Sequence, residues 1–186
     1  YGERGRRGDG GAASGTRIRG TALAHARTFA PTLELDTNGL VEKLVQVDRF
    51  IPAEPKDGDE WVEGDVGDLV AERPEIFTGA DLVIHLASAV SGECEADLDL
   101  GLNANLFAGV ALGRCLAATP HRPMLMFSSS LAIYGGTPDM PLPDLIDDSV
   151  RPTPQNSYGA QKLMLETFYA DLARRGLISA RSVRLM

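Results

Sequence analysis

The sequence has few of the residues that form disulfide frameworks or bind metal ions. It contains only two cysteines, Cys94 and Cys115, and three histidines, too few for a disulfide scaffold or a cysteine–histidine metal cluster. A pair of reduced thiols in a cytoplasmic protein is the simplest interpretation. The acidic residues within 93–99 are interpreted as the solvated start of a helix, so we expect no bound metal ion.

Long apolar segments and a positive net charge are also missing. No apolar run approaches the roughly 20 residues of a membrane-spanning helix, and the basic start is not followed by an apolar signal-peptide segment. The net charge is -8 at pH 7, which disfavours nucleic acid or an anionic membrane surface as a partner. We therefore expect a cytoplasmic protein that binds a small molecule or a cofactor.

The length and composition are those of one domain. The chain has 186 residues, of which 44% are hydrophobic, enough for one core and short for two. Residues 1–19 are rich in glycine and arginine and nearly free of apolar side chains, a composition that favours irregular coil. The folded domain is predicted over residues 20–186.

Short apolar segments that end in polar residues predict a parallel sheet. Strands are predicted at 43–48, 61–65, 81–90, 124–127 and 180–185, with helical patterns between most of them. This alternation favours an α/β fold of the Rossmann type, a doubly wound parallel sheet in three α/β/α layers. Ligands bind such sheets at the carboxyl ends of the strands.

The segment between residues 124 and 162 carries the strongest chemical signal. The strand at 124–127 is followed by three serines, of which Ser130 is the last, and Tyr158 and Lys162 are spaced i,i+4 on one helix face. A free phenol titrates near ~10, and a neighbouring ammonium favours its charged form. We predict that Tyr158 acts as a base, that Lys162 lowers its pKa, and that Ser130 orients a substrate oxygen.

Two motifs resemble a known family. Phe-Ser-Ser-Ser-x-x-x-Tyr-Gly at 127–135 and Pro-Gln-x-x-Tyr-x-x-x-Lys at 154–162 resemble the short-chain dehydrogenases/reductases, in particular their extended branch, the NAD-dependent epimerase/dehydratase family. The resemblance implies an enzyme that moves hydride between a secondary alcohol and NAD. Its catalytic residues would be Ser130, Tyr158 and Lys162, and Lys162 would also hold the cofactor ribose.

The resemblance also implies a set of cofactor contacts. Asp48 ends a predicted strand, where the fold places a carboxylate that binds the adenosine ribose and favours NAD over NADP, although the adjacent Arg49 leaves NADP open. Asp65 and Val66 match a step that contacts adenine, and a helix N-cap is the alternative role of Asp65. Asn105 is implied to support the active-site strand. The other implied contacts are Gly20, Leu86, Ala87, Ser88, Asn105, Tyr158 and Lys162.

The glycine loop that binds pyrophosphate departs from the family pattern. Gly20 resembles its third glycine and begins a predicted first helix at Gly20–Ala26, but Arg17 and Ser14 stand where the family has glycines. The first two glycines allow a tight turn and close approach of the backbone to the phosphates. The sequence therefore predicts a weakened phosphate site, with direct phosphate contact by Arg17 or Arg19 as the alternative.

The segments at 87–93, 95–101 and 154–162 resemble, within the family, the D-erythronate dehydrogenases, which oxidise the C2 hydroxyl of a four-carbon sugar acid with NAD. The resemblance covers the dinucleotide-binding part, and most of the C-terminal substrate region is lacking. A nucleotide-sugar epimerase/dehydratase and a non-catalytic Rossmann nucleotide-binding fragment are the alternatives. The helices at 102–118 and 158–175 are those that the family uses for dimers, which leaves a homodimer open.

Overall fold

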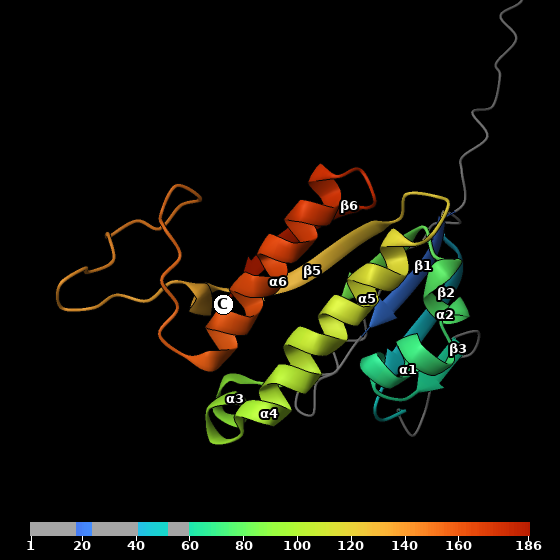
Figure 1. Cartoon of the computed structure of the whole chain (residues 1–186), viewed down its shortest axis with the longest axis horizontal. Helices are drawn as coiled ribbons and strands as arrows, with labels where there is room; N and C mark the ends of the chain where they lie inside the picture. The colour runs from blue at the N-terminus through green and yellow to red at the C-terminus, as the bar shows by residue number, and fades with distance from the viewer. Residues whose placement is uncertain (1–17, 24–40, 52–59) are drawn as a thin grey trace, which may run out of the picture.

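A single parallel sheet forms the centre of the computed structural model, which describes residues 18–23, 41–51 and 60–186. The strand order is β3-β2-β1-β4-β5-β6 (Figure 1). In this doubly wound order, β2 and β3 are added on one side of β1, and β4, β5 and β6 on the other. The order confirms the predicted Rossmann-type fold. The strands are β1 (Ile18–Leu23), β2 (Val41–Asp48), β3 (Glu60–Glu63), β4 (Leu82–His85), β5 (Met124–Ser130) and β6 (Ser179–Leu185).

The central strand β1 corrects the sequence prediction for Gly20. Instead of beginning a helix, Gly20 pairs with Leu44 of β2 on one side and with Leu82 of β4 on the other. Pairing along both edges outweighs the weak local helix preference of this short segment. The strand also begins at Ile18, inside the segment predicted to be irregular. Gly20 is thus not the glycine at a helix start, and Ser14, Arg17 and His25 lie outside the described residues.

The longer helices lie together on one face of the sheet (Figure 1). Right-handed crossovers between parallel strands place α1, α5 and α6 on the same side, where α1 contacts α5 and α5 contacts α6. The connection 24–40 between β1 and β2 lies outside the described residues, so the second helical layer stays a prediction. The helices are α1 (Val66–Glu72), α2 (Glu75–Thr78), α3 (Ser91–Ala96), α4 (Leu98–Gly101), the π-helix η1 (Leu102–Phe107), α5 (Ala108–Ala117), the 3-10 turn η2 (Leu131–Ile133) and α6 (Ser157–Arg174).

The helical run from α4 to α5 supplies much of the core. Among the described residues, it is the one helical segment, Leu98–Ala117, with the length and hydropathy of a membrane span. Its Leu112 and Leu116 are completely buried in the cluster that fills the space between the sheet and the helices. A helix with one such apolar stripe suits the inner layer of an α/β domain.

Two glycines bring α5 unusually close to α6. A Cβ atom on Gly109 would lie 2.7 Å from Leu165, and one on Gly113 would lie 2.7 Å from Phe168. Because real Cβ atoms do not approach other atoms so closely, any larger residue would displace the Leu165 and Phe168 side chains or push the two helices apart. The glycines therefore fix the position of α6, the helix that carries Tyr158 and Lys162.

A buried histidine links β4 to this helix pair. The Nδ1 atom of His85 lies 3.1 Å from the hydroxyl of Tyr169, which donates to the carbonyl of Gly109 at 2.9 Å. Burial lowers the pKa of His85 to about 3, and the nearby ammonium of Lys162 adds to the effect. His85 is thus a neutral, hydrogen-bonded core residue, as its place inside an apolar strand predicts.

The pH dependence of stability should report this neutral histidine. Between an unfolded pKa near 6.5 and the folded pKa of about 3, the unfolded state binds the extra proton. The free energy of unfolding should therefore fall as the pH falls through this window, by up to about 1.4 kcal/mol per pH unit from this group. The free energy of unfolding, measured by urea unfolding at several pH values, should depend clearly less on pH in His85→Leu than in the wild type. His121→Gln, which replaces a half-buried histidine, serves as the control. The same pH dependence of the free energy of unfolding in His85→Leu and in the wild type would contradict the assignment.

Candidate active site

The carboxyl end of β5 presents Ser130 beside the first turn of α6. The strand is longer than predicted and continues through all three serines. Ser130 caps the 3-10 turn η2, and its hydroxyl oxygen accepts a hydrogen bond from the amide of Ala132 at 3.1 Å. This turn ends the strand and fixes the direction of the Ser130 side chain.

The first turn of α6 holds Tyr158 and Lys162 on one face. Asn156 caps the helix by accepting a hydrogen bond from the amide of Gly159 at 2.7 Å. The Nζ atom of Lys162 lies 5.4 Å from the centre of the Tyr158 ring, and the hydroxyls of Ser130 and Ser88 lie near enough to the Tyr158 phenol to lower its pKa. The structure thus brings together the three residues that the motifs pick out, together with Ser88 from the loop after β4.

The pKa of Tyr158 differs from the prediction. Burial of the half-exposed phenol raises its pKa, and the hydroxyls of Ser130 and Ser88 only partly oppose this rise. A low-polarity environment disfavours the charged phenolate. Burial therefore outweighs the expected lowering by Lys162, whose ammonium lies over the face of the ring and donates to the carbonyl of Ser128 at 2.8 Å.

Lys162 is itself almost completely buried. Its side chain is 2% exposed, and its Nζ atom lies 4.8 Å from the centre of the Phe127 ring, within the range of a cation–π contact. Desolvation lowers its pKa to about 8. Lys162 is therefore charged at neutral pH and loses its proton more readily than an ordinary lysine.

Asn105 joins the loop after β4 to α6. Its Oδ1 atom accepts from the amide of Ala89 at 2.7 Å and from the hydroxyl of Ser88 at 3.1 Å, and its Nδ2 atom donates to Oε1 of Gln161 at 2.9 Å. Asn105 lies in the π-helix η1, and such turns are frequent at functional sites. These contacts join the loop after β4 to α6, and the support of the active-site strand by Asn105 stays a prediction.

Gln161 is a site residue that sequence reasoning missed. It is 1% exposed and receives the hydrogen bond from Asn105 directly beside Lys162 in the chain. A glutamine within an amphipathic helix gives no signal of burial, so only the packing of α4 and η1 against α6 reveals it.

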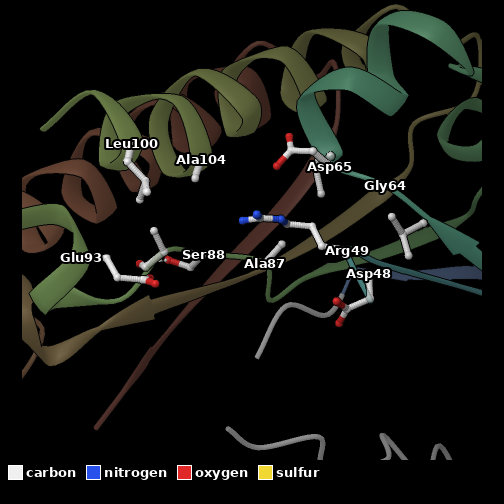
Figure 2. Close-up of a pocket in the computed structure, with 12 residues that line it drawn as sticks. Asp48, Arg49, Gly64, Asp65, Ala87, Ser88, Glu93, Leu100 and Ala104 are labelled. Atoms are coloured by element: carbon white, nitrogen blue, oxygen red, sulfur yellow. Dashed lines mark hydrogen bonds between the residues drawn. The ribbon is translucent and has the colours of Figure 1, made fainter. Parts of the chain in front are cut away.

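A groove that is open to solvent lies at the carboxyl ends of β2, β3 and β4. Five of the predicted cofactor residues line it: Asp48, Asp65, Val66, Ala87 and Ser88 (Figure 2). Leu86 is half-buried and is not part of the lining. The other lining residues are Val47, Arg49, Gly64, Ala89, Glu93, Leu100 and Ala104.

The groove combines carboxylates with one arginine. Asp48 accepts a hydrogen bond from the amide of Phe50 at 3.0 Å, and Figure 2 shows Arg49 extending into the groove between the labelled side chains. Asp65 accepts from the amide of Gly67 at 2.9 Å and caps α1, which confirms the N-cap alternative. Its side chain nevertheless borders the groove. A polar ligand with hydroxyl groups could find acceptors at this end of the sheet.

Fold and site together define a Rossmann-type domain with serine, tyrosine and lysine gathered at the end of its fifth strand. The chain belongs to the NAD dependent epimerase/dehydratase family, whose model matches residues 30–186. The Gly/Arg-rich start therefore lies outside the matched region.

Individual relatives agree with this family. The chain is 37% identical over 173 residues to a D-erythronate dehydrogenase of Cupriavidus necator, covering 92% of this chain and 52% of the relative. It is 40% identical over 105 residues to a D-erythronate dehydrogenase of Haemophilus influenzae, covering 56% and 32%. A nucleoside-diphosphate-sugar epimerase from Agrobacterium tumefaciens superposes with a TM-score of 0.76 at 27% identity, covering 100% and 56%. The chain spans about half the length of the first of these relatives.

A glycine next to Tyr158 allows the close approach of α6 to η2. A Cβ atom on Gly159 would lie 2.1 Å from the carbonyl oxygen of Ala132, so Gly159→Ala must move the helix start away from Ser130. Displacement of reacting groups by about 1 Å costs on the order of a hundredfold in rate. We expect a loss of that size in kcat for Gly159→Ala in an active enzyme. Gly92→Ala is the matched control, since its Cβ would meet nothing within 4 Å; equal kcat values for the two variants would contradict the close-contact role.

Proposed function

We propose that this chain is the cofactor-binding and proton-transfer part of an NAD-dependent oxidoreductase that oxidises a secondary hydroxyl of a sugar acid, such as the C2 hydroxyl of D-erythronate. The observation that carries the proposal is the placement of the Tyr158 phenol beside the hydroxyl of Ser130 and the buried ammonium of Lys162. Membership of the family and the likeness to two D-erythronate dehydrogenases support the choice of reaction and substrate class.

The groove residues fit the adenosine part of NAD. The carboxylate of Asp48 stands at the end of β2, where it would accept hydrogen bonds from ribose hydroxyls. The small side chains of Ala87 and Ser88 leave the backbone after β4 accessible from the groove. Arg49 is exposed and also reaches into the groove, so the preference for NAD over NADP rests on Asp48. When bound, NAD supplies the hydride acceptor.

The remaining steps belong to the side chains of this chain. Ser130 would donate or accept a hydrogen bond at the substrate oxygen and hold it near Tyr158. The phenolate of Tyr158 would then take the hydroxyl proton at its own oxygen. Lys162, charged below a pKa of about 8, would favour the phenolate as it forms, against the larger opposing effect of burial on the Tyr158 pKa. Lys162 would also hold the cofactor ribose.

Two further proposals concern assembly and location. The helices at 102–118 and 158–175 expose Phe107 and Met164, which would suit packing against a second copy in a homodimer. Acidic composition favours a small-molecule substrate in the cytoplasm over nucleic acid or a membrane surface.

Removing one oxygen tests the proposed role of Tyr158. General acid–base groups contribute about 10²–10⁴-fold to rate, so Tyr158→Phe should lose at least about a hundredfold in kcat with D-erythronate, measured as reduced-nicotinamide absorbance. Its affinity for NAD, measured by calorimetry, should stay within about twofold of wild type, because the groove is untouched. Tyr134→Phe is the control, since its hydroxyl contacts Arg184. Unchanged turnover in Tyr158→Phe would rule out the assignment.

The same assay separates the alternatives. The likeness to a nucleoside-diphosphate-sugar epimerase favours a second candidate, in which hydride is removed from a nucleotide sugar and returned. That activity would convert the nucleotide sugar without net reduced nicotinamide in solution. Absence of heat on titration with millimolar NAD would instead favour a non-catalytic Rossmann fragment.

A further inference from the structure

The short helix α3 lies between the groove and the catalytic face of α6. Three successive side chains of α3 contact three different parts of the site. Glu93 lines the groove and accepts from the amide of Val90 at 3.0 Å. Cys94 is buried and its sulfur accepts from Nδ2 of Asn105 at 3.3 Å. Glu95 reaches α6 directly.

Glu95 holds the first residue of α6. Its Oε1 atom accepts a hydrogen bond from the amide of Ser157 at 2.5 Å, and the nearby Ser157 hydroxyl adds to the lowering of the Glu95 pKa that this bond causes. The first amides of a helix have no partner inside the helix, and the positive end of its dipole attracts a carboxylate. Asn156 satisfies the amide of Gly159, so Glu95 supplies a second partner for this helix start, from a different part of the chain.

The contact has a direct consequence for Tyr158, the next residue after Ser157. A capping side chain that belongs to α6 would move together with the helix, so it could not fix the helix start relative to the rest of the site. Glu95 instead ties the helix start to α3, which also packs onto Asn105 through Cys94. Asn105 in turn contacts Ser88 and Gln161. The helix start is thereby held against the loop that carries Ser88, one of the two serines whose hydroxyls lie near the Tyr158 phenol.

We propose that Glu95 is a positioning residue for Tyr158. By accepting the hydrogen bond from the amide of Ser157, beside the Ser157 hydroxyl, it sets the distance between the Tyr158 phenol and the hydroxyls of Ser130 and Ser88. The kinetic consequence of this positioning rests on the proposed function, whereas its effect on the phenol does not. Neither of the two catalytic motifs contains this glutamate, which lies in an exposed acidic stretch and is connected to the site through the fold.

Three variants test the proposal. In Glu95→Ala the helix start loses its partner, so kcat should fall about tenfold while KM for NAD stays within about twofold, as expected for a group that acts only on placement. Glu95→Gln should restore kcat to within about twofold, because the amide oxygen accepts the same hydrogen bond. Glu72→Ala, which removes an exposed glutamate from α1, should behave as wild type. Thermal unfolding of each variant verifies that it is folded.

A second measurement does not depend on turnover. Tyrosines labelled at the ring carbon that bears the hydroxyl report each phenol pKa by NMR, and the Tyr158→Phe spectrum assigns the Tyr158 signal among the four tyrosines. The hydroxyls of Ser130 and Ser88 lower the pKa of Tyr158. Their displacement from the phenol in Glu95→Ala should therefore raise this pKa further, and Glu95→Gln should leave it unchanged.

The outcomes are distinct. A full-length enzyme that contains this chain and shows no turnover would contradict the proposed function, and the NMR titration would still decide the role of Glu95. A Tyr158 pKa and kcat in Glu95→Ala equal to those of wild type would overturn the positioning role. Equal losses in Glu95→Ala and Glu95→Gln would also overturn it, because the effect would then follow the charge and not the hydrogen bond.

Discussion

The close approach of α6 to the end of β5 is the constraint on which the site depends. Gly159 allows the helix start to touch the carbonyl of Ala132, and Gly109 and Gly113 allow the rest of the helix to settle onto α5. Packing at this density transmits small displacements instead of absorbing them. These contacts hold the first turn of α6, and with it Tyr158, close to the end of β5.

The same close packing has an electrostatic cost. It removes water from Tyr158 and Lys162, so that the pKa of the phenol is raised and that of the ammonium is lowered to about 8. Both neutral forms are favoured by burial. His85, on the neighbouring strand, shows the same effect with a pKa of about 3. The site thus holds its titratable groups in a low-polarity environment, where the nearby hydroxyls of Ser130 and Ser88 have a larger effect.

Sequence patterns predicted the sheet and the catalytic cluster because both leave local signals. Apolar runs closed by hydroxyls marked β5, and the i,i+4 spacing marked Tyr158 and Lys162. The sequence pattern did not predict β1, because Gly20 has no local preference for a strand. It adopts the strand conformation through pairing with β2 and β4. The roles of Gln161 and Glu95 were equally invisible, because each depends on contacts between helices far apart in the chain. The pKa of Tyr158 was predicted from its charged neighbour alone, without the desolvation that dominates it.

The pH dependence of kcat/KM for the oxidation tests the central claim most directly, namely that Tyr158 is a base whose ionisation is opposed by burial. Only the phenolate can take the proton, and its fraction grows about tenfold per pH unit below the pKa. From about pH 6 to about pH 7, where Lys162 remains largely charged because its pKa is about 8, kcat/KM should rise with a slope close to one on logarithmic axes. A flat profile over this range, with NAD affinity constant, would contradict the claim, because the base would then already be ionised at neutral pH.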